Sequence, residues 1–538
     1  MIIIGLNRHH NGNACILEDG KITYSTEEER LNRHKYEGSP FLNLLQIKDL
    51  APHIDGVAIA GFDRLIPFEK YTDVNYYEML FNRLYKNQKF VNRKYDHLHH
   101  LTHAACAFYN SGFEEAISVV FDGDGSFWKK EGIEKYSAFH CKHPYNINKL
   151  EKEYFDYDEP YSKTNTLSLG NYFAAIADHF GMNPLFDAGK VMALASYGKN
   201  IIEDFDSFFD HNFYIDQRLV RMSCLNHNHP MFEKTQLMKD FQASADLALT
   251  VQTLTENIMI KKIHDLIDNH NVKNICLSGG YALNCVANFK LRQSLPKDIN
   301  LYVEPVSHDA GTAIGAAKLL YHEMRMLEGI TDDPIIPQTT VKYGFQNHYP
   351  ATYDFARFKK TKVTNKDVAK KLSENKIVAL FKDRSELGPR ALGNRSILFN
   401  PNNSKAKDIV NKVKNRESYR PFAGTILHED CKQYFDMNVL DESPFMMYAV
   451  KAKNYSLKGI RHVDGTCRIQ TLKKEQDTVF YDLIKEFKQI TNIPCLLNTS
   501  FNLSGEPMVE TLDDAVKTFE NSEIDCLYLP ELYILLEK

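Results

Sequence analysis

The chain has 538 residues, a length that predicts two or more domains rather than a single core. Its hydrophobic content of 43%, charged content of 25% and net charge of −5 are ordinary for a globular protein and argue against a general nucleic-acid or membrane surface. No stretch approaches the roughly 20 apolar residues that a membrane-spanning helix needs. The ten cysteines are scattered without a CxxC pair, which argues against a zinc ribbon or a disulfide scaffold and favours reduced thiols in a cytoplasm.

The first residues predict a buried strand rather than a signal peptide, because the apolar run at 2–6 meets polar residues almost at once. Two more strands are expected at 14–17 and 21–25. The Asp19-Gly20 pair between them is a hairpin signal. The chain therefore opens with three short strands.

Two histidines, His99 and His103, stand four residues apart in HHLTHAACAFYNSG, and the apolar run predicts a helix that ends at 110–112. Positions i and i+4 share one face of a helix, so the two imidazoles can hold one metal ion. Alone, such a pair is more often a packing or surface pair. Asp122, which follows a strand-like run, and Asp309 in HDAG could complete a site, and together the four residues favour a metal centre.

A glycine turn, Ser278-Gly279-Gly280, separates a strand expected at 272–277 from a helix-like run that starts at Tyr281. A strand, a glycine turn and a helix start suit a bound nucleotide. Cys285, four residues further on, is expected to be a buried helix residue rather than a reactive thiol.

Another helix is expected at 312–326, where Gly315 would allow close packing. Between about 328 and 353, prolines interrupt a segment without sustained periodicity, and we place a domain boundary there. Beyond it we expect a helical segment at 368–372, a strand at 377–381, a helix that Thr511 and Asp514 open as a capping box, and last strands near Leu527 and Tyr533.

The segment RSELGPRALGNRSIL, at 384–398, places three arginines among glycine, proline and apolar residues. Glycine lets backbone approach a ligand closely, and arginine suits phosphate or carboxylate. Any one arginine is usually a solvated surface residue, but the whole set favours a site for a small polyanion. The candidates share a cationic or neutral hydrogen-bonding side chain, and the last three stand on alternate positions that share one face of a strand: Arg390, Lys414, Arg416, Arg420, His462, Arg468, Asn498, Ser500 and Asn502.

The chain resembles the O-carbamoyltransferase family, of the nodulation-factor and tobramycin carbamoyltransferase type. Five segments of the chain resemble the N-terminal domain of the family: HHLTHAACAFYNSGF, VVFDGDG, DAGKVMALASYG, SGGYALNCVAN and HDAGTAIGAA. Four later segments resemble its C-terminal domain: ELGPRALGNRSIL, KNRESYRPFA, HVDGTCRIQT and NTSFNLSGEPMV. The resemblance covers nearly the whole chain in the family's order.

This resemblance implies an α/β protein of two domains. Residues 1–340 would form a two-lobed actin-like domain, similar to the tRNA threonylcarbamoyl-transferase domain, that binds metal and transfers the carbamoyl group. Residues 355–538 would form an α/β domain similar to threonylcarbamoyl-AMP synthase that makes carbamoyl-adenylate.

The resemblance also implies a reaction. ATP, with Mg²⁺, and carbamoyl phosphate would give carbamoyl-adenylate, which passes internally to the N-terminal domain and carbamoylates an acceptor hydroxyl. Fe²⁺ or a similar divalent metal would be held by residues His99, His103, Asp122 and Asp309. The remaining roles are carried over by position: catalytic residues His10, Arg390, Lys414, Arg420 and Arg468, substrate-binding residues Arg416, Asn498, Ser500 and Asn502, and carbamoyl-adenylate-binding residues Gly279, Gly280 and Asn284.

Two segments depart from the family pattern. Asn11-Gly12-Asn13 replaces an Asp-Ala-Ser run after the first histidine, which puts the acceptor preference in doubt. Residues 383–386 read Asp-Arg-Ser-Glu in place of Gly-Arg-Met-Glu, so the arginine and the glutamate are kept.

Three alternatives remain open: a tRNA-modifying enzyme, which predicts a basic RNA surface; a hydrogenase-maturation carbamoyltransferase, which needs CxxC fingers; and a non-catalytic actin-like ATP-binding module. The expected partner is a small-molecule hydroxyl acceptor, such as a sugar, an antibiotic or a hydroxymethyl-pyrimidine nucleotide, in a pocket that residues 65–96 help to shape. Neither a nucleic-acid polymer nor a membrane is expected, and a homodimer is compatible with the sequence.

Overall fold

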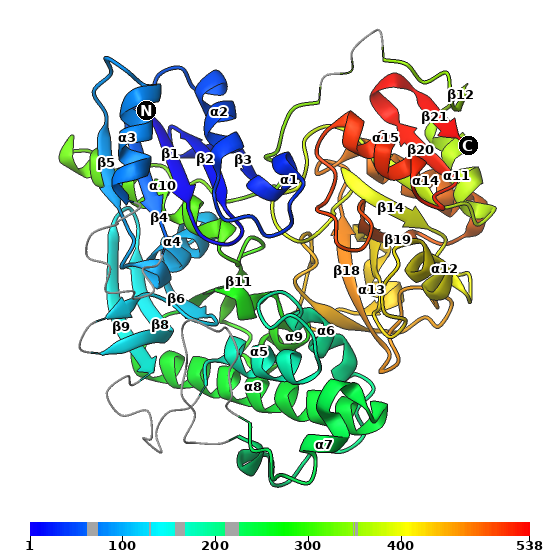
Figure 1. Ribbon diagram of the computed structural model, residues 1–538, viewed down its shortest axis with the longest axis horizontal. Helices are drawn as coiled ribbons and strands as arrows, with labels where there is room; N and C mark the ends of the chain where they lie inside the picture. Colours follow the sequence, from blue (N-terminus) through cyan, green and yellow to red (C-terminus); the bar gives the residue numbers. More distant parts are fainter. Residues whose placement is uncertain (62–73, 129–130, 156–166, 210–224, 348, 350–352) are drawn as a thin grey trace. The chain divides into compact units, whose positions relative to one another are not determined.

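The computed structural model describes residues 1–61, 74–128, 131–155, 167–209, 225–347, 349 and 353–538, and shows an α/β protein (Figure 1). The chain divides into two compact units. Unit 1 comprises Met1–Thr23 and Glu37–Gln338, and unit 2 comprises Tyr24–Tyr36 and Thr339–Lys538. The expected pocket segment at 65–96 lies partly outside the described residues.

Unit 1 contains two sheets and the helices that cover them. In chain order its elements are β1 (Ile2–Asn7), β2 (Asn13–Glu18), β3 (Lys21–Glu27, which ends in unit 2), α2 (Phe41–Leu50), β4 (Gly56–Ala60), α3 (Val74–Leu84), β5 (Val91–Lys94), α4 (His99–Ser111), β6 (Glu115–Phe121), β7 (Phe127–Trp128), β8 (Gly132–Lys142), β9 (Asn146–Phe155), α5 (Leu169–His179), α6 (Ala188–Ala195), α7 (Phe232–Thr235), α8 (Phe241–His270), β10 (Asn274–Ser278), α9 (Cys285–Ser294), β11 (Asn300–Val303) and α10 (Ala310–Leu327).

The two sheets of unit 1 share one strand order. In the first sheet, β3-β2-β1-β4-β5, β1 runs antiparallel to β2 and parallel to β4, and β4 runs parallel to β5. In the second sheet, β9-β8-β6-β10-β11 with β7 beside β8, β6 runs antiparallel to β8 and parallel to β10, and β10 runs parallel to β11. The same arrangement of antiparallel and parallel pairs therefore occurs twice.

Helices α10 and α4 pack against each other and each covers a different sheet. Helix α10 contacts β1, β2 and β4, and α4 contacts β6, β8 and β10. A Cβ on Gly315 of α10 would lie 1.8 Å from the carbonyl oxygen of Thr102 on α4, so only glycine allows this approach. The close packing predicted at Gly315 is confirmed, and it brings the N-terminal halves of the two helices into contact.

Unit 2 is built on one mixed ten-stranded sheet in the order β12-β21-β20-β13-β14-β19-β15-β18-β17-β16. Its elements are α1 (Glu28–Asn32), β12 (Lys359–Lys362), α11 (Asn365–Ser373), β13 (Val378–Phe381), β14 (Arg395–Phe399), α12 (Ala406–Val413), β15 (Ala423–Leu427), α13 (Cys431–Tyr434), β16 (Phe435–Asp436), β17 (Ala449–Ala452), β18 (Thr466–Leu472), α14 (Thr478–Thr491), β19 (Cys495–Ser500), α15 (Leu512–Glu520), β20 (Cys526–Leu529) and β21 (Ile534–Glu537).

Most predicted elements are confirmed, and two boundaries are corrected. The helix of the histidine pair ends at Ser111, and Gly112 follows in a left-handed conformation with φ 78°. The helix expected from Tyr281 starts instead at Cys285, because residues 280–283 form a 3₁₀ turn and Asn284 caps the helix that follows. The strand expected to carry three alternating polar residues ends at Ser500.

Among the described residues, no helix has the length and apolar character to cross a membrane. The nine cysteines in the described ranges are free and buried, including Cys285.

Candidate metal centre and anion site

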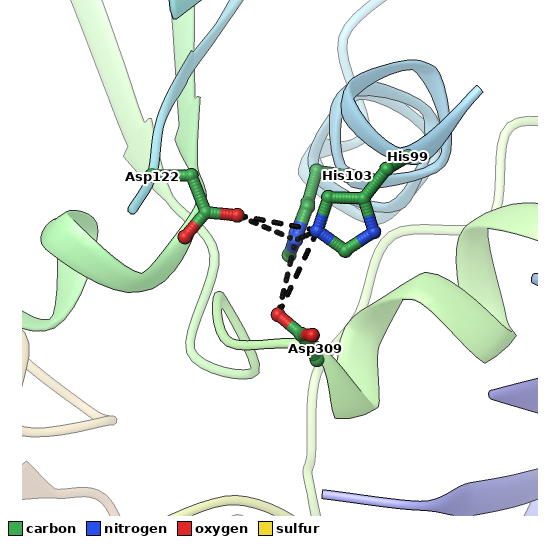
Figure 2. A group of neighbouring side chains, drawn as sticks. All are labelled: His99, His103, Asp122 and Asp309. Carbon is green, nitrogen blue, oxygen red and sulfur yellow. Dashed lines mark hydrogen bonds and ion pairs between the residues drawn. The ribbon is translucent and has the colours of Figure 1, made fainter. Parts of the chain in front are cut away.

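Helix α4 begins at His99, so the two histidines occupy its first two turns. Both side chains are buried, and their Nε2 atoms lie 3.2 Å apart with the ring planes at 87°. The backbone N–H of His99 donates to Ser126 Oγ at 3.1 Å, and the Thr102 hydroxyl donates to the His99 carbonyl oxygen at 2.7 Å. The predicted helical face thus turns both imidazoles toward one point (Figure 2).

Two carboxylates complete the group. Asp122 follows β6, and its Oδ2 lies 3.3 Å from the Nε2 of each histidine. Asp309 directly precedes α10, and its Oδ1 lies 3.7 Å from His99 Nε2 and 3.6 Å from His103 Nε2 (Figure 2). All four donor atoms lie within 4.8 Å of one another and all four residues are buried. Two imidazole nitrogens and two carboxylate oxygens in a buried cluster fit a divalent transition metal.

Opposite charges balance each other within this cluster. Burial alone would lower the pKa of His103, but hydrogen bonds to Asp122 and Asp309 outweigh it and raise that pKa to about 9. Burial alone would raise the pKa of Asp122, but hydrogen bonds from His103 and His99 hold it well below its usual range. The carboxylates therefore stay ionised, and a metal ion would replace the proton that they share with the imidazoles.

His10 lies beside this cluster, on the turn between β1 and β2. Its Nε2 is 3.4 Å from Asp309 Oδ2, and its side chain is 35% exposed. The Asn7 side chain fixes the turn by donating to the carbonyl oxygens of His10 and Asn11, each at 3.2 Å. The rings of His10 and Phe186 form a T-shaped pair with 6.3 Å between centroids. His10 is thus a partly exposed imidazole in contact with a buried carboxylate, as a proton-handling residue would be.

The predicted nucleotide turn lies at the same cluster. The backbone N–H of Gly280 donates to Asp122 Oδ1 at 3.0 Å, and Gly279 has φ 87°. The Asn284 side chain exchanges hydrogen bonds with Gln252 at 3.0 and 3.1 Å and caps α9. Gly280 and Asn284 therefore make hydrogen bonds within the protein, and their contact with a nucleotide stays a prediction.

In unit 2, Lys414 is the centre of the predicted anion site. Its buried Nζ donates to the carbonyl oxygen of Ser500 at 2.5 Å, to Ser500 Oγ at 3.2 Å and to Asn502 Oδ1 at 3.0 Å. Burial, and then the charges of Arg416 and Arg420, hold the pKa of Lys414 well below its usual range. Three of the predicted residues thus meet at one amine, with two guanidinium groups close enough to repel it.

Arg416 is fixed by neutral groups. It donates to Asn411 Oδ1 at 2.6 Å and to the Pro421 carbonyl oxygen at 2.7 Å. Burial, and then the charges of Arg420 and Arg468, lower its pKa well below the usual range. Glu417, which pairs with Arg420 at 3.4 Å, and Glu506 oppose these shifts only in part, so positive charge accumulates here and an anionic ligand would relieve the repulsion.

Asn498 lies on β19, two residues before Ser500, and its side chain holds a loop. Its Nδ2 donates to the Ala391 carbonyl oxygen at 3.2 Å and to Thr425 Oγ1 at 3.0 Å, and the residue is 1% exposed. Arg390, next to Ala391, is partly buried in the loop between β13 and β14. Asn498 therefore fixes the loop that carries Arg390.

The same loop has a second buried support that sequence reasoning did not assign. Glu386 Oε1 accepts hydrogen bonds from the backbone N–H groups of Leu392 at 2.6 Å and Asn394 at 2.9 Å. Gln470 Nε2 donates to the Leu392 carbonyl oxygen at 3.2 Å. His462, another sequence candidate, is buried with Nε2 3.2 Å from the Tyr419 carbonyl oxygen.

Lys35 is a further residue that sequence reasoning missed. It belongs to the N-terminal segment that folds with unit 2, and its charge contributes to the lowered pKa of Lys414. The segment is anchored by Arg30, which donates to the Gly388 carbonyl oxygen at 2.9 Å, and by Arg33, which donates to that of Met508 at 2.7 Å. No local pattern in the sequence indicates these contacts.

The comparisons with known proteins agree with a two-part chain. Residues 49–318 match the family model described as Carbamoyltransferase N-terminus, and residues 369–536 match that described as Carbamoyltransferase C-terminus. The chain belongs to the carbamoyltransferase family and is a carbamoyltransferase enzyme.

Relatives align over most of their length. The nodulation protein NolNO of Sinorhizobium fredii is 31% identical, over 96% of this chain and 78% of that protein. The 3′-hydroxymethylcephem-O-carbamoyltransferase of Amycolatopsis lactamdurans is 26% identical, over 97% of each chain. A solved structure of full-length HypF in the phosphate- and nucleotide-bound form is 16% identical and covers 60% of this chain and 55% of that chain, with a TM-score of 0.38, too low to define the fold.

Proposed function

We propose that this carbamoyltransferase is ATP-dependent and works in two steps, one in each unit. Unit 2 makes carbamoyl-adenylate from carbamoyl phosphate and ATP, and unit 1 transfers the carbamoyl group to a hydroxyl of a small molecule. The observation that carries the proposal is the pairing of two unlike sites in one chain: a cationic cluster around Lys414 and a group of two histidines and two aspartates.

The first step needs positive charge. Water first cleaves carbamoyl phosphate into carbamate and phosphate. A carbamate oxygen then attacks the α-phosphorus of ATP and displaces pyrophosphate, which gives carbamoyl-adenylate. Two polyanions must approach each other, and Lys414, Arg416, Arg420 and Arg468 are assigned to lower their repulsion. Ser500 and Asn502 position the Lys414 amine. Arg390 joins them from its braced loop, and Mg²⁺ accompanies ATP.

The second step takes place at the cluster of unit 1. The acceptor oxygen attacks the carbamoyl carbon, AMP leaves, and the hydroxyl proton passes to a base, for which His10 is our candidate. A divalent metal such as Fe²⁺, held by His99, His103, Asp122 and Asp309, would supply Lewis-acid polarisation of the carbonyl and a charge for the phosphate. The turn at Gly279 and Gly280, with Asn284, is assigned to the adenosine part.

The acceptor is proposed to be a small hydroxylated molecule: a sugar, an antibiotic or a hydroxymethyl-pyrimidine nucleotide. The cephem relative supports this class, since its name specifies O-carbamoylation of a hydroxymethyl group. The finer fold follows the same proposal. The repeated strand order of the two sheets supports two actin-like lobes in unit 1, and the mixed sheet supports a threonylcarbamoyl-AMP synthase-like unit 2.

Pyrophosphate release tests the proposal directly. Purified full-length protein with ATP and Mg²⁺ should release pyrophosphate only when carbamoyl phosphate is added. A panel of hydroxylated acceptors, followed by mass spectrometry, should then show a product heavier by one carbamoyl group. Folded protein that releases no pyrophosphate under these conditions would refute the first step.

A further inference from the structure

The turn at the end of β10 touches two members of the metal cluster. Ser278 is the last residue of β10 and is fully buried, and its Oγ lies 3.4 Å from His103 Nδ1. Two residues later, Gly280 N–H donates to Asp122 Oδ1. One short segment therefore contacts a histidine and a carboxylate on the sides that face away from the other ligands.

The geometry of His103 leaves its two ring nitrogens with different tasks. Nε2 faces His99 Nε2, Asp122 Oδ2 and Asp309 Oδ1, which makes it the atom available to a metal. A neutral imidazole that gives the Nε2 lone pair to a metal must carry its proton on Nδ1. The Ser278 hydroxyl is placed to accept that N–H, which would fix both the tautomer and the orientation of the ring.

Asp122 is fixed in a similar way. Its Oδ2 faces the imidazoles, while Oδ1 accepts from the backbone N–H groups of Gly123 at 2.9 Å and Gly280 at 3.0 Å. A Cβ on Gly279 would lie 2.3 Å from the Phe121 carbonyl oxygen, so this glycine lets the turn pass directly over the end of β6. The turn can reach both ligands only because residue 279 has no side chain.

We propose that Ser278 is a positioning residue for the metal centre, acting through the Nδ1–H of His103, and that the Ser278–Gly280 turn holds the ligands in their metal-binding orientation. This inference rests on the proposed function, because it assumes that the cluster binds a metal. It assigns to the turn a task beyond the nucleotide contact that its sequence pattern suggests.

Ser118 offers a matched control. It lies on β6, beside Cys276 of β10, and its buried hydroxyl donates at 2.9 Å to the Ala104 carbonyl oxygen of α4. Ser118→Ala thus removes a buried hydroxyl bonded to the same helix from the neighbouring strand, but leaves the hydrogen bonds of the ligands intact.

The test is the affinity of the full-length apo protein for Co²⁺, measured by competition with a chromophoric chelator. Ser278→Ala should weaken Co²⁺ binding by about 10- to 100-fold, the usual effect of losing a hydrogen bond behind a metal ligand. Ser278→Thr, which keeps a hydroxyl, should recover most of the affinity, and Ser118→Ala should bind like the wild type. Melting temperatures of the apo proteins report any general loss of packing.

The outcomes separate this inference from the proposed function. If the wild type binds no Co²⁺, the metal centre itself is refuted. If the wild type binds and Ser278→Ala binds equally well, or if Ser118→Ala loses as much affinity as Ser278→Ala, the positioning role of Ser278 is refuted while the metal centre stands.

Discussion

The single side chains of the two sites differ in how their charge is balanced. In unit 1, the carboxylates of Asp122 and Asp309 face the imidazoles of His99 and His103, so negative and positive groups within the cluster balance each other. In unit 2, Lys414 and Arg416 donate hydrogen bonds to neutral groups, and their pKa values fall because of burial and the charges of nearby arginines. The first site is therefore suited to a cation that replaces protons, and the second to an anion brought in as substrate.

This difference predicts that the two steps can be lost separately. Arg420→Ala should slow carbamoyl-phosphate-dependent pyrophosphate release by at least about 100-fold, because it removes a positive charge from the site where polyanions meet. Asp309→Ala should leave that release within about twofold of the wild type and abolish transfer to the acceptor. Both are measured as pyrophosphate and as carbamoylated product.

The matched control for the arginine is Arg357→Ala, which removes a 54% exposed arginine of unit 2 that pairs with Glu520. It should leave both steps unchanged. A finding that Asp309→Ala and Arg420→Ala lose the same step would contradict the assignment of one step to each unit.

At the residue scale, sequence predicted those ligands that have a local signature. His99 and His103 share a helical face, and Asp122 and Asp309 stand at the end of a strand and the start of a helix. The sequence pattern predicts that Ser278 belongs to a nucleotide turn. It cannot indicate the contact with His103, because the two residues are 175 positions apart. Local patterns reveal what a residue can do, but only tertiary packing decides what it touches.

At the scale of elements, the α4–α10 contact sets the geometry of the metal centre. Helix α4 carries both histidines, and Asp309 stands at the start of α10. Gly315 lies over Thr102, one residue before His103. Because the Cβ of any other residue would meet the Thr102 carbonyl oxygen, the distance between the helices depends on this glycine.

Gly315→Ala should therefore destabilise the protein and weaken its metal binding together. Forcing one methyl group into this contact should cost about 1–3 kcal/mol. It should also move Asp309 away from the histidines. Thermal unfolding and Co²⁺ affinity measure the two effects.

Gly189→Ala is the matched control, because Gly189 also lies in a helix, α6, and its Cβ would meet nothing within 4 Å. This change should be neutral or stabilise by about 0.4–1 kcal/mol. If Gly315→Ala behaves like Gly189→Ala, the helix contact does not set the site.

Element prediction succeeded where side-chain patterns were local. The Thr511 capping box, for example, opens α15 with both of its hydrogen bonds formed. The predicted start of α9 is wrong, because the glycine turn continues as a 3₁₀ turn and the helix begins only after its N-cap residue, Asn284. The alternation at Asn498, Ser500 and Asn502 also predicted one strand face. Asn498 and Ser500 do stand on alternate positions of β19, but the strand ends at Ser500 and Asn502 lies beyond it. Ser500 and Asn502 bond to Lys414, whereas Asn498 bonds to the Ala391 loop.

At the scale of the whole molecule, the N-terminal segment Tyr24–Tyr36 is the least predictable feature. The sequence placed it within the first domain by position, but it folds with unit 2 through Arg30 and Arg33. These contacts join residues 358 and 475 positions apart, and strand and helix patterns carry no information over such distances. Each unit is therefore made of two segments that are not contiguous in the sequence.

Buried histidines give unit 1 a predicted sensitivity to acid. Burial, and then the charge of His227, lowers the pKa of His179 from 6.5 to about 4. Burial also lowers the pKa of His322 to about 4, where Asp333 opposes the shift and His143 adds to it. Neither residue belongs to the metal cluster, and both stay neutral in the folded protein at pH 6.

The sign of the effect follows from the direction of the shift. Since the folded-state pKa values lie below the unfolded value, the unfolded chain binds more protons between pH 6.5 and 4, and stability falls as pH falls through that window. Each histidine adds a slope of up to about 1.4 kcal/mol per pH unit. Melting temperature, measured in steps across the window, should therefore fall less steeply in His179→Gln than in the wild type. His53→Gln, at an exposed histidine, serves as the control. If the melting temperature of His179→Gln falls with pH as steeply as that of the wild type, His179 does not take up a proton on unfolding.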